Sequence, residues 1–200
     1  MTRTRIKICG LTREADVDAA VAAGADAIGF VLYPKSPRFV TPERAAELSR
    51  RLPPMVTPVL LFVNENAMNI AAACACVPSA ALQFHGEESA EACSAEAHAT
   101  GRVFWRAARI PAGDGVGFDL LKFAHTFQAA QAILLDAHVE GYGGGGKTFD
   151  WSRVPPNIPA HLVLSGGLTP ANVGAGIAAL RGRGHSLAVD VSSGVEADGP

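Results

Sequence analysis

The residues that could do chemistry in this chain gather at one end of a series of short apolar runs. Cys9 closes the first run, His85 directly follows the fourth, and Asp136 closes the sixth. Thiol, imidazole and carboxyl groups are the side chains that enzymes use to transfer protons. The opposite ends of the runs carry turn residues instead, such as Gly24 and Pro53. This asymmetry is typical of an enzyme whose active site lies at one end of a sheet.

A glycine-rich segment, residues 141–148, matches the pattern G-x-x-x-x-G-K-[ST] of a loop that wraps nucleotide phosphates. Such a loop needs a full helix directly after it, because the amides of the helix N-terminus bind the phosphate. Pro155 and Pro156 leave room for only about one turn, which disfavours a nucleoside-triphosphate site. We interpret the four glycines, the last of which is Gly146, as a flexible loop whose amides approach a phosphorylated ligand. A simple spacer is the alternative.

Two further segments predict a site for a phosphate group. Each follows an apolar run near the end of the chain, and each combines glycine with serine. Loops after the seventh and eighth strands commonly bind phosphate in parallel (β/α)8 barrels. We therefore expect a phosphorylated small molecule as the ligand, although each loop alone could be a tight turn. The candidate phosphate-binding residues are Gly166 and Gly167 in the first segment, and Ser192, Ser193 and Gly194 in the second.

Eight apolar runs supply the strands that position these residues. Their apolar content is nearly continuous, which is typical of strands covered on both faces. The alternation of strands with helical patterns predicts a parallel sheet with right-handed crossovers. Eight such units without a linker predict an α/β fold, a (β/α)8 TIM barrel, as a single domain over residues 1–200. An open doubly wound sheet is the alternative, but no G-x-G-x-x-G follows the first strand. The predicted strands are residues 5–9, 27–32, 59–63, 81–84, 103–107, 132–136, 162–165 and 187–191.

Several helix boundaries can also be predicted. Thr12 suits the cap of a helix that runs to residue 23, with Gly24 just past its end. Thr41-Pro42 and Thr169-Pro170 predict two more starts, because proline suits the first helical position. The other helices are expected at residues 66–77, 87–100 and 119–131, with about one turn at 151–154.

The twofold periodicity of strands indicates which side chains point into the barrel. If Cys9 faces the ligand, Lys7 faces the barrel interior, and Asp190 shares a face with Ala188 on the last strand. Arg106 is assigned to the interior in the same way. Buried charges need partners, and the first and last strands are neighbours in a closed barrel. We therefore predict an ion pair between Lys7 and Asp190.

Composition limits the classes of function. The 200 residues carry a formal net charge of −2, a pI near 6.3 and 48% hydrophobic residues. These values give no electrostatic case for binding nucleic acid or an anionic membrane. We expect a cytoplasmic protein with no secretory signal and no membrane span. Cys74, Cys76 and Cys93 fit buried positions in Ala-rich helices, and no zinc-site spacing is present.

Nine motifs occur in the order of one known family. Together they cover nearly the whole chain and resemble the phosphoribosylanthranilate isomerase family. The resemblance implies an isomerase of tryptophan biosynthesis that catalyses an Amadori rearrangement of N-(5-phosphoribosyl)anthranilate without metal or cofactor. The motifs are KICGLT (7–12), GADAIGFV (24–31), YPKSPR (33–38), FVNE (62–65), QFHGEE (83–88), LLDA (134–137), GGGGKTFDW (143–151), LSGGLTPANV (164–173) and VDVSSGVE (189–196).

The resemblance also implies roles for single residues. Asp136 matches the general acid that protonates the ring oxygen of the sugar, and Cys9 matches the general base that removes the proton from C2. Arg38 matches the arginine that holds the anthranilate carboxylate. His85 and Asp190 are expected to contact the substrate, with a positioning or a catalytic role for His85. The glycines and serines after strands seven and eight match the phosphate site.

The proposed chemistry makes opposite demands on the two proton-transferring groups. A base must be deprotonated, and a free thiol has a pKa of about 8.5. Lys7 would favour the thiolate of Cys9, whereas burial would raise the pKa of the thiol, and the sequence leaves this balance open. An aspartate that acts as an acid needs a raised pKa, because a free carboxyl at about 3.9 is ionised at pH 7.

The chain departs from the family pattern at its end, where the family continues into a last helix. We expect that this helix is absent from the chain or that the polypeptide continues. The alternative function is therefore a non-catalytic or impaired phosphosugar-binding barrel. Ribulose-phosphate epimerase needs a histidine–carboxylate metal set that is incomplete here, and indole-glycerol-phosphate synthase needs more strand lysines than Lys7. The expected partner is a small phosphorylated substrate, and the expected assembly is a monomer or homodimer.

Overall fold

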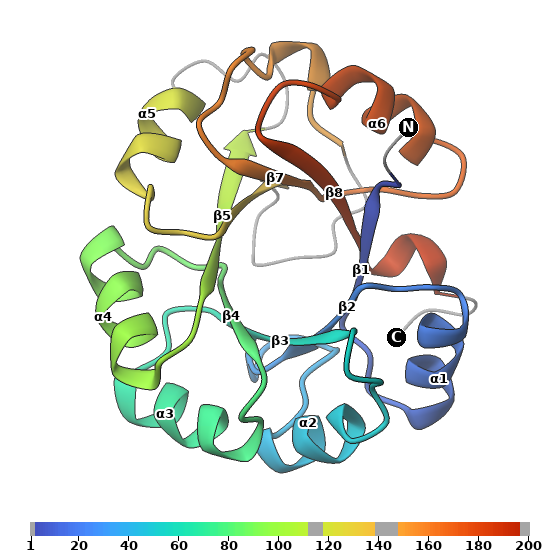
Figure 1. Cartoon of the computed structure of the whole chain (residues 1–200), viewed down its shortest axis with the longest axis vertical. Helices are drawn as coiled ribbons and strands as arrows, with labels where there is room; N and C mark the ends of the chain where they lie inside the picture. The colour runs from blue at the N-terminus through green and yellow to red at the C-terminus, as the bar shows by residue number, and fades with distance from the viewer. Residues whose placement is uncertain (1–2, 112–117, 139–147, 197–200) are drawn as a thin grey trace.

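The computed structural model describes residues 3–111, 118–138 and 148–196, which form a closed barrel of eight parallel strands in chain order (Figure 1). β8 closes the barrel on β1, where Lys7 lies opposite Asp190. The predicted (β/α)8 fold is confirmed, and so are all eight predicted strands, with β5 running on to Pro111. The strands are β1 (Arg5–Cys9), β2 (Ala27–Val31), β3 (Thr57–Phe62), β4 (Ala81–Phe84), β5 (Phe104–Pro111), β6 (Ala132–His138), β7 (His161–Leu164) and β8 (Ser186–Val191).

The helices surround the sheet, and several begin at residues whose side chains cap them. Thr41 accepts a hydrogen bond from the amide of Arg44, and Pro42 takes the first position of α2, as predicted. Asn66 caps α3 through the amide of Asn69. The helices are α1 (Glu14–Ala22), α2 (Pro42–Ser49), α3 (Ala67–Cys76), α4 (Ala90–Thr100), α5 (Leu120–Thr126) and α6 (Val173–Leu180), with the short 3-10 helices η1 (Trp151–Arg153) and η2 (Ser193–Val195).

Two helices begin later than the sequence predicts, because side chains at the predicted starts bind the loops. The carboxylate of Glu88 accepts the amide of Gly86, and α4 begins only after Ser89, which caps it. The amide of Thr169 donates to the side-chain oxygen of Asn172 at 2.8 Å, and α6 follows that turn. Thr169-Pro170 is therefore a turn and the predicted start there is wrong.

Two other helix ends also differ from the prediction. Arg13 rather than Thr12 is the N-cap residue of α1, and it makes no side-chain capping hydrogen bond. α5 ends at Thr126 because the chain must return to the sheet, where the amide of Gln131 donates to the carbonyl of Phe104 at 2.8 Å. The end of α1 is as predicted, since Gly24 follows it with a φ of +89°.

Apolar side chains form one layer outside the barrel and two clusters inside it. The outer layer joins the strands to the helices and includes the fully buried rings of Phe30, Phe62 and Phe84. Such burial of both sheet faces explains why the strands are nearly continuous apolar runs. The inner clusters are Cys9, Val31, Leu61 and Val63, and Ala107, Ala132, Leu134 and Val163.

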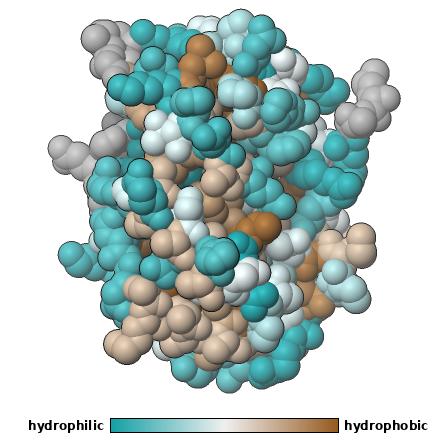
Figure 2. All heavy atoms as spheres, turned by 60° about the vertical axis from the view of Figure 1, so that its left-hand side comes forward, coloured by the Kyte–Doolittle hydropathy of each residue, from teal (hydrophilic) through white to brown (hydrophobic). Residues whose placement is uncertain are grey.

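Much of the face of the molecule seen in Figure 2 is hydrophilic, with weakly hydrophobic surface gathered in its lower part. This lower part corresponds to the Ala-rich helices α3 and α4 of Figure 1. None of the helices in the described ranges is both long and apolar enough to cross a lipid bilayer.

Candidate active site

His85 and Asp136 meet in the mouth of the barrel, the end at which the strands have their carboxyl termini. His85 Nε2 lies 2.9 Å from Asp136 Oδ2, and the two side chains are 9% and 13% exposed. Gln83 Nε2 lies 3.0 Å from the other ring nitrogen, Nδ1. If the amide of Gln83 donates to Nδ1, the ring carries its proton on Nε2 and donates it to the carboxylate. The histidine then holds the carboxyl group of Asp136 in place from the side.

Cys9 ends β1 with its thiol buried beside Lys7. The two side chains fill the space next to Gly29 on β2, where an added Cβ would lie 2.6 Å from Cys9 Sγ and 3.0 Å from Lys7 Nζ. Burial raises the pKa of the Cys9 thiol, and the positive charge of Lys7 offsets this only in part. The balance that the sequence left open thus favours the protonated thiol.

Lys7 and Asp190 form the predicted ion pair. Lys7 Nζ lies 2.7 Å from Asp190 Oδ1, and the side chains are 3% and 5% exposed. Ser165 Oγ lies 3.4 Å from the second carboxylate oxygen. Burial lowers the pKa of Lys7, but the charge of Asp190 and its hydrogen bond to the ammonium raise it, so that the pKa is above its usual value and the lysine stays protonated. Because Asp190 is directed toward Lys7, its contact with a substrate stays a prediction.

Arg38, the predicted carboxylate-binding residue, already holds a carboxylate. Its Nε and Nη2 donate to the two oxygens of Glu196 at 2.6 and 2.8 Å, and this bidentate pair lowers the pKa of Glu196. The arginine side chain packs over Gly10, where an added Cβ would lie 2.4 Å from Arg38 Cδ and 3.3 Å from Ser192 Oγ. Arg38 therefore lies beside the predicted phosphate-binding loop after β8.

The loops after β7 and β8 contact each other at the mouth. Gly166 and Gly167 have φ values of +78° and +62°, in the left-handed region that favours glycine. A Cβ on Gly166 would lie 2.8 Å from Asp136 Oδ1, and a Cβ on Gly194 would lie 1.8 Å from the carbonyl oxygen of Leu168. Gly166 is thus next to Asp136, and the loop after β8 packs against the loop after β7. Gly146, with the rest of the four-glycine run, lies outside the described residues.

The orientation of β5 differs from the prediction. Arg106 does not face the interior; its guanidinium lies over the rings of Phe123 and Phe127 in the outer layer. Trp105 and Ala107 are the residues that pack inside the barrel. Two residues further on the same face is Arg109, opposite Asp136 in the strand register, and it donates to Glu87. Arg109 is therefore a cation near the mouth that the sequence analysis missed.

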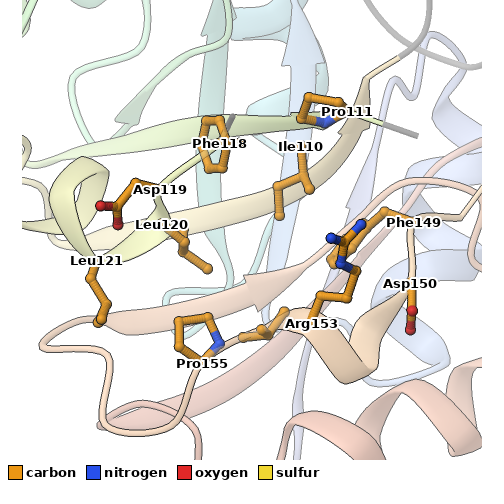
Figure 3. Close-up of a pocket in the computed structure, with 11 residues that line it drawn as sticks. Ile110, Pro111, Phe118, Asp119, Leu120, Leu121, Phe149, Asp150, Arg153 and Pro155 are labelled. Carbon is orange, nitrogen blue, oxygen red and sulfur yellow. The ribbon is translucent and has the colours of Figure 1, made fainter. Parts of the chain in front are cut away.

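A cavity of about 510 Å³ lies apart from these residues, between β5, α5 and η1 (Figure 3). Several of the residues that line this cavity belong to the outer apolar layer. None of its described lining residues is a predicted site residue. Its lining comprises Ile110, Pro111, Phe118, Asp119, Leu120, Leu121, Phe149, Asp150, Arg153, Val154 and Pro155.

The mouth thus contains a thiol on β1 and a carboxyl–imidazole pair from β6 and the residue after β4, with glycine-containing loops after β7 and β8. Such groups can donate and remove protons at different atoms of one ligand. Across the three described stretches of the chain, no group of three or more His, Cys, Asp or Glu side chains is placed to hold a metal ion.

Comparison with known proteins gives one consistent result. The profile of the family described as N-(5'phosphoribosyl)anthranilate (PRA) isomerase matches residues 6–200. The N-(5'-phosphoribosyl)anthranilate isomerase of Methylibium petroleiphilum is 61% identical over 194 residues, which are 97% of this chain and 85% of the relative.

Solved structures agree with this result. The phosphoribosyl anthranilate isomerase of Thermotoga maritima has a TM-score of 0.82 and 41% identity, over 98% of this chain and 90% of that one. A phosphoribosyl anthranilate isomerase in complex with reduced 1-(o-carboxyphenylamino)-1-deoxyribulose 5-phosphate has a TM-score of 0.78 and 38% identity, with the same coverage.

Proposed function

This chain belongs to the N-(5'-phosphoribosyl)anthranilate isomerase family, and from this premise we propose how its barrel mouth catalyses the reaction of that family. The reaction is an Amadori rearrangement, in which the aldose N-(5'-phosphoribosyl)anthranilate becomes the ketose 1-(2-carboxyphenylamino)-1-deoxyribulose 5-phosphate. It is an aldose–ketose isomerisation in tryptophan biosynthesis. One proton must reach the ring oxygen of the sugar, and one must leave C2.

Asp136 and Cys9 are the groups to which we assign these two proton transfers. Asp136 protonates the ring oxygen, which opens the furanose to an imine. Cys9 removes the C2 proton in its thiolate form, the minor form that the positive charge of Lys7 favours, to give an enolamine that tautomerises to the ketone. The observation that carries the assignment is the placement of both residues at the carboxyl ends of strands that β7 and β8 separate in one closed barrel. A sugar bound between them would meet each group from a different side. Both steps are proton transfers, so the proposal needs neither metal nor cofactor.

The remaining predicted residues support binding of the substrate in this proposal. The phosphate lies at Gly166, Gly167 and the loop after β8, of which Gly166 is next to Asp136. The anthranilate carboxylate takes the place of Glu196 on Arg38, because a bidentate arginine site accepts one carboxylate as readily as another. His85 orients Asp136. The monomeric or homodimeric state and the cytoplasmic location stay predictions.

The experiment follows the loss of phosphoribosylanthranilate fluorescence in purified wild-type enzyme and in two variants. Cys9→Ala and Asp136→Asn are each expected to lower kcat by at least about 10²-fold, the low end for a removed general acid or base. Cys74→Ala, in α3 and likewise buried, is the matched control and is expected to keep full turnover. Full turnover by either of the first two variants would contradict the assigned role of that residue.

A further inference from the structure

The guanidinium of Arg106 binds the two peptide carbonyls that flank His85. Arg106 Nη1 donates to the carbonyl of Phe84 at 3.0 Å, and Nη2 donates to the carbonyl of Gly86 at 2.9 Å. The side chain is buried, with 5% of the residue exposed. Arginine presents several donors in a rigid planar fork, whereas lysine presents a single ammonium on a flexible stem. Binding of both carbonyls at once therefore depends on the planar set of donors that arginine presents.

Glu88 completes this arrangement around the loop after β4. Its Oε2 lies 3.4 Å from Arg106 Nη1 and accepts the amide of Gly86 at 2.8 Å. Its Oε1 accepts the amide of Asn64, after β3, at 2.7 Å. Both the N–H and the C=O of Gly86 are thus bound by the Arg106–Glu88 pair. The loop that carries His85 is fixed to β3 on one side and to β5 on the other.

Two aromatic rings pack against the guanidinium. Its central carbon lies 4.9 Å from the ring centre of Phe127 and 5.8 Å from that of Phe123, both in or next to α5. A cation over an aromatic face is stabilised most where water is excluded, as it is in the outer apolar layer. The arginine therefore packs against α5 while its donors reach from β5 to the end of β4.

We propose that Arg106 is a positioning residue for the acid–base chemistry at Asp136, acting through the backbone on either side of His85. The proposal rests on the proposed function of Asp136. By fixing the peptides before and after His85, Arg106 sets where the imidazole enters the mouth and so maintains the 2.9 Å contact between His85 and Asp136. A displacement of about 1 Å in such a group can cost about 10²-fold in rate.

The test compares variants of the full-length enzyme at temperatures where each is folded. Arg106→Lys keeps the charge beside Glu88 but cannot bind both carbonyls, and Arg106→Gln serves as a second variant if it fails to fold. We expect kcat to fall by about 10- to 10²-fold while KM changes by less than about threefold, because the proposed sites for the phosphate and the carboxylate stay in place. The imidazole ¹⁵N–¹H signal of His85, identified by its loss in His85→Gln, is expected to shift or broaden.

Phe127→Leu is the matched control, since it removes the ring behind the guanidinium but neither carbonyl hydrogen bond. This variant is expected to lower the unfolding temperature. Its kcat should stay within about twofold of the wild-type value, and its His85 signal should not shift. An Arg106→Lys or Arg106→Gln variant with wild-type kcat and an unshifted His85 signal, beside an inactive Asp136→Asn, would overturn this inference alone. Full turnover by Asp136→Asn would overturn the proposed function and this inference with it.

Discussion

Removing one partner of the Lys7–Asp190 ion pair is expected to destabilise the fold strongly. Both side chains are almost fully buried and their charged atoms are 2.7 Å apart, so that the lone remaining charge would have no water to replace its partner. Asp190→Asn leaves the ammonium of Lys7 inside the barrel. Lys7→Met leaves a carboxylate there instead. Either variant must neutralise the remaining group or admit water.

The free energy that each single variant loses has an upper limit, because the remaining charged group can be neutralised by losing or gaining a proton. A lysine of ordinary pKa, about 10.4, can lose its proton at pH 7 for about 4.6 kcal/mol, since each pH unit below the pKa costs 1.36 kcal/mol. An aspartate of ordinary pKa, about 3.9, can gain one for about 4.2 kcal/mol by the same reasoning. These limits agree with the about 3–5 kcal/mol that broken buried pairs cost, which is a large share of the about 5–15 kcal/mol by which a protein is stable.

The assay is urea unfolding followed by circular dichroism, at several pH values, of wild type and both single variants. With a slope of about 2 kcal/mol per M, each single variant should lower the midpoint by about 1.5–2.5 M at pH 7. The loss of stability in Asp190→Asn relative to wild type should shrink as the pH rises, because deprotonating Lys7 then costs less free energy. The loss of stability in Lys7→Met should shrink as the pH falls, because protonating Asp190 then costs less.

The double variant Lys7→Met/Asp190→Leu is the control for lost contacts, because it leaves no charge behind. It should regain most of the stability that the single variants lose. The reasoning is refuted if the single variants lose less than about 1 kcal/mol, or if their deficits respond to pH in the same direction. Either result would mean that water reaches the pair.

The remaining predictions concern the thiol of Cys9 and two glycines. Because burial raises the pKa of the Cys9 thiol, iodoacetamide should alkylate Cys9 more slowly than free cysteine at pH 7. The alkylation rate should still rise above pH 9. Mass spectrometry, with Cys9→Ala as the reference, measures this rate. The raised pKa also stabilises the fold below the unfolded thiol pKa of about 8.5, and this contribution should be lost as the pH rises through the folded value. Gly194→Ala should lose about 1–3 kcal/mol of stability and raise KM, since the added Cβ would lie 1.8 Å from the carbonyl oxygen of Leu168. Gly174→Ala, in α6 with nothing within 4 Å, should instead be neutral or gain up to about 1 kcal/mol in the same unfolding assay.

The strands and the buried ion pair could be predicted because they depend on local patterns and on one topological rule. Continuous apolar runs located all eight strands, and the twofold periodicity of β1 and β8 placed Lys7 and Asp190 on the inner face. Closure of the barrel then made those two residues neighbours across 183 positions of the chain. No such rule pairs Arg38 with Glu196, because both lie in loops, and that contact could not have been predicted from spacing.

The orientation of β5 could not be predicted because its sequence, FWRAARIP, offers two arginines three residues apart. Residues three apart on a strand lie on opposite faces, so only one of Arg106 and Arg109 can face the interior. A strand buried on both faces has no polar alternation to decide which. Assigning Arg106 to the interior was wrong, and the same error hid Arg109 beside Asp136.

The two proton-transferring groups have different surroundings. The chemistry asks for a base at Cys9 and an acid at Asp136, and the charged groups near the two residues are arranged differently. On the β1–β8 side, the thiol of Cys9 lies beside a buried charge pair whose cation opposes the effect of burial on its pKa. On the β4–β6 side, the direct partner of Asp136 is an imidazole, and the cation Arg106 acts from the outer layer on the backbone rather than on the carboxyl group. A cation placed directly on that carboxyl group would favour its ionised form and so oppose its action as an acid. Arg106, behind the sheet, supplies rigidity without adding its own charge at Asp136, although Arg109 on the inner face lies opposite Asp136 in the register and pairs with Glu87. Lys7 supplies charge beside Cys9, where a thiolate must form.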